Sequence, residues 1–171
     1  MLHYVPTDSD AILASKTDIQ NYAENLAIEL NYNYKNLNDV IMRVGAEIDF
    51  VNPLSDNNSF NGSMLVNKIN ETINISLSNL TGELRNNFTI AHELGHLYLH
   101  AKNIKKDIIE FNRYGSGRLE WEANWFAAAF LMPEKIFIQK CNEFNSDNYE
   151  LSLYFNVSES AIKIRKKDLG I

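Results

Sequence analysis

The sequence predicts an α+β fold that is mostly helical, with a small antiparallel or mixed sheet of about three strands and a pair of C-terminal helices. Apolar residues recur at helical spacing in several long segments and alternate with polar residues in a few short central ones. Hydrophobic residues make up 45% of the 171 residues, which is enough for one buried core. We therefore expect a single domain with N-terminal helices and a first strand (1–60), a sheet with two central helices (61–134), and helix-turn-helix-like C-terminal helices (135–171).

The N-terminal part predicts two helices and one strand. From Asp18 to Leu30 apolar residues follow helical spacing, and Thr17 with Gln20 can form a capping box at the start. A second, shorter helix is expected over residues 37–44. The segment "EIDFVNP" after it is typical of a strand that ends at Pro53.

The central part predicts a hairpin. After a turn-rich segment at residues 55–62, "SMLVNKINETINISLS" suggests two strands paired around "NKINE". In "INISLS" the apolar Ile73, Ile75 and Leu77 alternate with polar residues, which marks a strand with one polar face. Such a strand can align an extended peptide if its edge is free.

Two long helices and a C-terminal pair follow. The pattern is helical over residues 84–99, and the long linker "AKNIKKDIIEFNRYGSG" is expected to be a loop over a site. The next helix, "RLEWEANWFAAAFLM", ends before Pro133, which we expect as the first residue of another helix. The tail predicts a helix, a turn at Asn156 and Val157, and a last helix capped by Ser158.

Composition limits the class of function. The net charge of −6 argues against direct binding to nucleic acid as the main task, since that needs a dominant basic surface. The longest apolar run, residues 125–132, is too short to span a membrane. The N-terminus lacks the pattern of a secretory leader, and the single cysteine, Cys141, excludes an internal disulfide. We therefore expect a cytoplasmic protein without a membrane segment.

The stretch "FTIAHELGHLYLH" contains a His-Glu-x-x-His motif at His92, Glu93 and His96. On a helix the two histidines lie one above the other, about 6 Å apart, so both imidazoles can bind one metal ion. Glu93 is rotated by about 100° and lies beside that ion, where a general base is needed. The other interpretation is a helix whose histidines only form hydrogen bonds within the fold.

A third histidine in this stretch, His100, has a different expected role. It lies about 12 Å along the helix from His92, too far for the two to share one ion easily. We interpret His100 as a helix-end residue favoured by the helix dipole, with contact to substrate as a weaker alternative.

A catalytic zinc site needs a third protein ligand, and the helix after the linker offers Glu120 and Glu122. These carboxylates project about 200° apart, so only one of them can face the metal. Glu120 is favoured because it shares its face with Asn124 and with small residues that allow close helix packing. Asn124 can then hydrogen-bond an imidazole and fix its orientation. Glu122 remains the alternative ligand.

Together, "RNNFTIAHELGHLYLH" and "EWEANWFAAAFLMP" closely resemble the two signature segments of the ImmA/IrrE family of zinc metallopeptidases. The tail is similar too, so the resemblance covers roughly residues 70–171. It implies a zincin-like fold, one Zn²⁺ held by His92, His96 and Glu120, and Glu93 as the catalytic residue. It also implies a protein substrate, a helix-turn-helix repressor whose cleavage derepresses a mobile element or a stress operon.

The expected function is therefore zinc-dependent hydrolysis of a peptide bond. The ion polarises the scissile carbonyl and lowers the pKa of a water toward about 7, while Glu93 transfers the proton to the leaving amine. The strand at residues 73–77 is expected to align the substrate, and Tyr114 is a candidate oxyanion donor.

Two alternatives belong to other classes. The chain is a DNA-binding regulator if its last helix directs basic residues toward phosphate, namely Lys163, Arg165, Lys166 and Lys167. It is a non-cleaving protein if its metal site is structural and it only captures the repressor.

Overall fold

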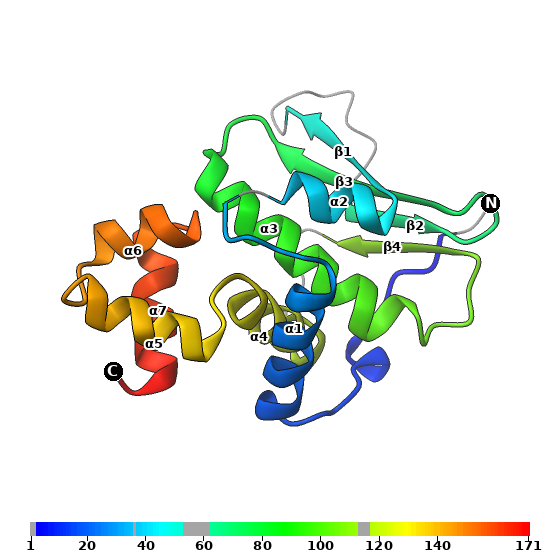
Figure 1. The fold of residues 1–171 in the computed structure, drawn as a ribbon. Coiled ribbons are helices and arrows are strands. Elements are labelled where there is room, and N and C mark those ends of the chain that lie inside the picture. The colour runs from blue at the N-terminus through cyan, green and yellow to red at the C-terminus, as the bar shows by residue number, and fades with distance from the viewer. Residues whose placement is uncertain (1–2, 36, 53–61, 113–116) are drawn as a thin grey trace.

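The computed structural model describes residues 3–35, 37–52, 62–112 and 117–171 (Figure 1). The first half contains η1 (Asp8–Asp10), α1 (Lys16–Glu29), α2 (Asn38–Val44), β1 (Ala46–Val51), β2 (Gly62–Asn67) and β3 (Thr72–Ser78). The second half contains α3 (Glu83–Gly95), η2 (His96–Ala101), β4 (Ile108–Asn112), α4 (Arg118–Leu131), α5 (Glu134–Glu143), α6 (Asn148–Phe155) and α7 (Glu159–Leu169). The predicted α+β class, with mostly helical structure and a small sheet, is confirmed.

The sheet is mixed, with strand order β1-β3-β2-β4. The predicted hairpin is confirmed, since β2 and β3 are antiparallel and Val66 lies opposite Ile73. β1 runs parallel to β3 on the other side. Because β3 lies between two strands, it has no free edge, and the expectation that residues 73–77 align a substrate there is wrong.

A fourth strand, β4, lies within the segment that was predicted to be a loop, and it pairs antiparallel with β2. Its apolar residues Ile108, Ile109 and Phe111 are all buried, so the strand lacks the alternation that marks a half-exposed one. Tyr4 adds a parallel bridge to Ile109 on the outer side of β4. The N-terminal segment therefore continues the sheet.

α3 lies on one face of the sheet and packs against α4, which in turn packs against α1 (Figure 1). The approach of α3 to α4 is close at Gly95, where a Cβ atom would lie 3.0 Å from the Cα atom of Ala123. Ala123 and Ala127 are fully buried at this contact. Small residues on both helices thus bring the histidine motif next to the carboxylates of α4.

Two helix starts differ slightly from the prediction. Ser15 rather than Thr17 caps α1, and its Oγ accepts a hydrogen bond of 3.1 Å from the backbone N–H of Asp18. Thr17 instead lies within the first turn. Pro133 precedes α5 as its N-cap residue instead of opening it.

The C-terminal helices match the prediction closely. α6 ends at Asn156, which adopts a left-handed conformation, and Ser158 caps α7 by accepting a hydrogen bond from the N–H of Ala161. Arg165 of α7 is fully buried, and its Nε atom donates to the carbonyl oxygen of Met132 at the end of α4 (3.0 Å). α7 is therefore fixed to the end of α4 through a buried guanidinium.

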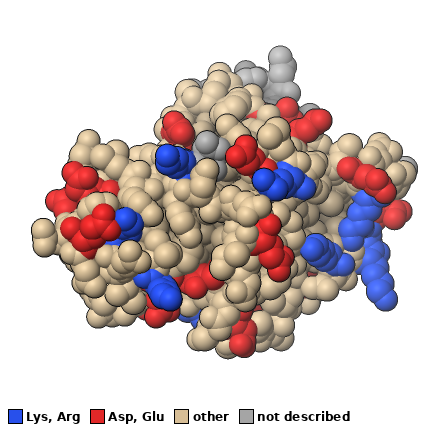
Figure 2. Space-filling model, viewed as in Figure 1, with Lys and Arg blue, Asp and Glu red and all other residues tan. Residues whose placement is uncertain are grey.

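This packing contradicts the placement toward phosphate for two of the four basic residues of α7, while Lys163 and Lys167 are exposed. Arg165 is inside the protein, and Lys166 Nζ donates to Ser146 O (2.6 Å) and Asn148 Oδ1 (2.7 Å). Figure 2 shows acidic and basic side chains interspersed on one face, without a continuous basic band among the described residues there. The DNA-binding alternative therefore loses one of its four proposed contact residues, Arg165.

Within the described part of the chain, no helix combines the length and the apolar character needed to cross a membrane.

Candidate metal centre

Three potential metal-ligand side chains meet where α3 ends and α4 begins. The Nε2 atoms of His92 and His96 are 3.0 Å apart. Glu120 Oε2 is 3.2 Å from His92 Nε2, and Glu120 Oε1 is 3.4 Å from His96 Nε2. One ligand atom from each residue lies within 4.8 Å of the others. Two imidazoles and one carboxylate are ligand types that suit zinc, and they leave a coordination position open for substrate.

Helix geometry explains this arrangement. His92 lies in the last turn of α3 and His96 follows at i+4, so the two rings point to the same side. Glu120 lies in the first turn of α4, which faces α3 across the Gly95 contact. The side chains of His96 and Glu120 are 1% and 16% exposed, so the centre is shielded but still reachable from one side.

Burial and mutual contacts shift the pKa values of Glu120, His96 and His92. Burial alone would raise the pKa of Glu120, but its contacts with His92 and His96 outweigh burial and lower it, so the carboxylate is ionised. Burial lowers the pKa of His96 to about 4, despite the opposing effect of Glu120. Burial acts in the same direction on His92, but Glu120 and Glu93 outweigh it and raise the pKa of His92. An ionised carboxylate beside a neutral His96 is the state in which these atoms bind a cation.

Asn124 lies one turn after Glu120 and contacts the first histidine. Its Oδ1 atom is 3.0 Å from His92 Nδ1. With Nδ1–H donating to the amide oxygen, Nε2 is the ring nitrogen of His92 whose lone pair a metal ion can take. This is the contact expected for Asn124 from the sequence.

Glu93 is 2% exposed, and its side chain contributes to the wall of a cleft beside His92. Its charge is near enough to raise the pKa of His92. The expected position of Glu93 beside the two histidines is therefore what the structure contains, and its catalytic role stays a prediction.

His100 lies in the last turn of the helical segment, as expected, but its surroundings differ from the expectation. From His96 onward the helix widens into a π-helical segment, η2, in which the backbone bonds span five residues. Residue i+4 then comes closer to lying directly above residue i, and His100 Nδ1 is 3.1 Å from His96 Nδ1. His100 is fully buried, so the expectation of contact with substrate is contradicted in this conformation.

Glu122, the alternative ligand, points away from the three donors. It is fully buried, and its Oε2 atom is 3.0 Å from His100 Nε2. Burial would raise its pKa, but His100, Arg118 and the N–H of Ile12 outweigh burial and lower it. The structure thus separates the two carboxylates as helix geometry required and brings only Glu120 to His92 and His96.

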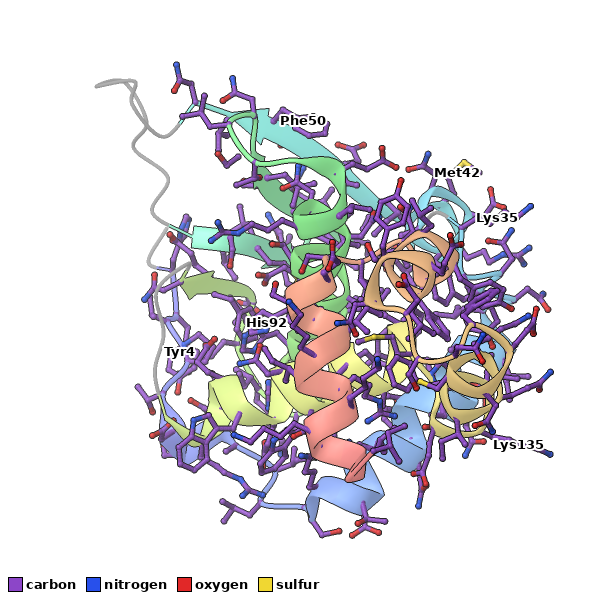
Figure 3. All side chains as sticks on the ribbon, turned by 90° about the vertical axis from the view of Figure 1, so that its left-hand side faces the viewer. Tyr4, Lys35, Met42, Phe50, His92 and Lys135 are labelled. Carbon is purple, nitrogen blue, oxygen red and sulfur yellow. The ribbon has the colours of Figure 1, made fainter. Side chains whose placement is uncertain are left out.

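A cleft of about 990 Å³ opens beside His92 and Glu93. Its walls come from β2 and β3, from α3 and α4, and from α7. Figure 3 shows His92 between α7 and the strands. Two large apolar side chains in the wall are mostly exposed, Trp121 of α4 (58%) and Ile164 of α7 (61%). The cleft therefore gives a large ligand access to His92 and to apolar contacts in its wall.

The sequence did not predict some residues of the cleft wall, and one predicted residue, Tyr114, is not among the described residues. Trp121 and Ile164 were not predicted at the site, although an apolar residue on the polar face of its helix was a usable signal. The joint role of His100 and Glu122 depends on the π-helical turn, which has no clear signature in sequence. Tyr114, the candidate oxyanion donor, lies outside the described residues.

The site and the fold together define the class of protein. A histidine pair on one helix, a carboxylate on a second helix and a cleft beside them form a candidate catalytic metal site of the metallopeptidase type. The family model of the IrrE N-terminal-like domain, Peptidase_M78, matches residues 55–167. The chain belongs to this peptidase family, as its resemblance to ImmA/IrrE proteins implied.

Comparison with solved structures supports the fold. The chain is similar to a Mycobacterium tuberculosis transcriptional regulator, with a TM-score of 0.54 and 18% sequence identity over 85% of this chain. The match covers 45% of that protein, so the chain spans a little under half of its length. A sequence search among curated proteins gave no significant match.

Proposed function

We propose that the protein is a zinc-dependent endopeptidase that cleaves a helix-turn-helix transcriptional repressor. The observation that carries this proposal is the convergence of His92, His96 and Glu120 within 4.8 Å, next to the buried Glu93 and an open cleft. Membership of the peptidase family supports a protein substrate. The repressor as substrate rests on the resemblance of the signature segments to ImmA/IrrE proteins.

His92, His96 and Glu120 would hold one zinc ion. When bound, the ion supplies Lewis acidity that polarises the scissile carbonyl and makes a water more acidic. Glu93 accepts a proton from the attacking water and passes it to the amine that leaves. Asn124 keeps the ring of His92 in place during these steps.

The cleft walls position the substrate. The substrate polypeptide enters between α7 and the sheet. There, Trp121 and Ile164 contact apolar side chains of the substrate near the scissile bond. Burial of one such side chain contributes about 1.5–3 kcal/mol, which gives preference for a particular register. Cleavage at one site then removes the repressor and derepresses its operon in the cytoplasm.

The test is Glu93→Gln. This change keeps the size of the side chain and removes the proton acceptor, so the variant should bind zinc as the wild type does and cleave at least about 100-fold more slowly. The substrate assayed is the helix-turn-helix regulator encoded nearest to the gene, and fragments are identified by mass spectrometry. Lys135→Gln, on exposed α5 surface, is the matched control and should cleave normally.

Two results would contradict the proposal. Cleavage by Glu93→Gln at the wild-type rate would exclude Glu93 as the proton acceptor. A stable complex of the zinc-loaded wild type with the regulator, without fragments, would favour capture without cleavage.

A further inference from the structure

A chain of hydrogen bonds leads from the candidate metal site into the protein through residues that do not line the cleft. His96 Nδ1 lies 3.1 Å from His100 Nδ1, and His100 Nε2 lies 3.0 Å from Glu122 Oε2. All three side chains are almost completely inaccessible, at 1%, 0% and 0% exposure. Water therefore does not compete for these contacts, and their donors and acceptors must match within the protein.

The far end of the chain is fixed by backbone groups. Glu122 Oε2 also accepts from the N–H of Ile12 (2.9 Å), while Oε1 accepts from the N–H of Leu13 and from Arg118 Nε (2.9 Å each). With four donors directed at its two oxygens, Glu122 acts only as an acceptor. The ring nitrogen of His100 that faces it must then carry a proton.

The positions of the ring protons on His100 and His96 follow from the acceptor role of Glu122. A neutral His100 that donates from Nε2 presents an unprotonated Nδ1 to His96. The two Nδ1 atoms cannot both carry a proton along one contact, so His96 Nδ1 donates to His100. The Nε2 atom of His96, which lies 3.0 Å from His92 Nε2 and 3.4 Å from Glu120, is left with a free lone pair.

We propose that His100 and Glu122 are positioning residues that hold His96 in the tautomer and ring orientation able to bind the metal. Neither residue touches the ion or the substrate. The opposite arrangement, with a proton on His100 Nδ1, would require His96 to carry its proton on Nε2 and would block that ligand atom. The inference rests on the proposed function only in requiring that His96 binds a metal.

The two histidine ligands are oriented by different means. His92 donates to the amide oxygen of Asn124, which is an acceptor in any protonation state. His96 faces another histidine, His100, whose ring nitrogen can donate or accept a hydrogen bond. The contact between His100 and Glu122 determines which nitrogen of His100 carries the proton. The π-helical turn over His96–Ala101 makes this possible because it brings the ring of His100 close to that of His96, with centroids 5.2 Å apart.

The direct test is nitrogen-15 NMR of the imidazoles in the zinc-loaded wild-type protein. The chain has four histidines, so each ring can be assigned, with His3→Gln identifying the remote one. We expect His96 protonated on Nδ1, and His100 protonated on Nε2 with an unprotonated Nδ1. A proton on His100 Nδ1 would overturn the proposal, and this result requires no substitution at the site.

A second test measures zinc affinity by competition with a chelator in three variants. His100→Leu removes both polar atoms and should weaken zinc binding about 10- to 100-fold, the range for residues that orient a ligand. In His100→Gln the amide oxygen can accept from His96 and the amide nitrogen can donate to Glu122, so affinity should stay within about three-fold of the wild type. Leu99→Ala, a buried change in the same turn, should lower the free energy of unfolding and leave zinc affinity unchanged.

The zinc affinities of these variants show whether His100 acts by positioning His96 or only by filling space in the core. Equal loss of affinity in His100→Gln and His100→Leu, or wild-type affinity in both, would overturn the proposal. None of these measurements requires peptidase activity. Failure to cleave any repressor would therefore contradict the proposed function without touching this inference.

Discussion

Glu120 and Glu122 are two residues apart on α4 and serve different parts of the molecule. Glu120 is partly exposed and contacts His92 and His96 at 3.2 and 3.4 Å. Glu122 faces inward and accepts four hydrogen bonds from His100, Arg118 and the backbone at Ile12 and Leu13. The same residue type thus gives a candidate ligand at one position and a fixed internal anchor at the other.

At the scale of single residues, Asn124 provides a prediction with an internal control. Asn124→Leu removes the acceptor for His92 Nδ1 and should weaken zinc binding about 10- to 100-fold, measured by chelator competition. Asn124→Asp keeps an acceptor oxygen in the same place and should retain most of the affinity. If both variants bound zinc equally well, orientation of His92 by this residue would be excluded.

At the scale of elements, the contact between α3 and α4 sets the distance between the histidines and Glu120. Gly95 lies at this contact, and a Cβ atom there would be 3.0 Å from Ala123 Cα and 3.1 Å from Ala123 O. Both are backbone atoms, so the helices have to move apart to make room.

Gly95→Ala should therefore destabilise the protein. Over-packing costs about 1–3 kcal/mol, which exceeds the roughly 1 kcal/mol that alanine gains over glycine inside a helix. Urea unfolding of the metal-free protein should show a net loss of about 1 kcal/mol. Gly82→Ala is the control because a Cβ atom there has no neighbour within 4 Å. Equal stability of the two variants would show that α3 and α4 adjust freely.

Element by element, the sequence predicts most of what periodicity and helix caps can encode. The β2–β3 hairpin, α4 and the α6–α7 pair lie close to their expected positions. β4 could not be predicted because its buried, nearly continuous apolar residues give no alternation. The π-helical turn at His96 could not be predicted either, since it depends on packing around His100 and Glu122, which are 22 residues apart.

At the scale of the whole molecule, segments distant in sequence converge on one site. α3 supplies His92, η2 supplies His96, and α4 supplies Glu120 and Asn124. α7 forms one wall of the cleft, and its Arg165 donates a hydrogen bond to the end of α4. The ligand set could be proposed from the sequence because each part lies within one helix. The contribution of α7 to the cleft could not, because it depends on how the last helix folds back over the others.

The central claim is that His92, His96 and Glu120 hold one metal ion. Elemental analysis of the purified protein after zinc loading and desalting tests it most directly, with Glu120→Gln beside the wild type and Glu83→Gln as a surface control on α3. The wild type and Glu83→Gln should each retain about one zinc ion per chain, the number for a single site of this ligand type, and Glu120→Gln should retain almost none. A full complement of zinc in Glu120→Gln would contradict the account.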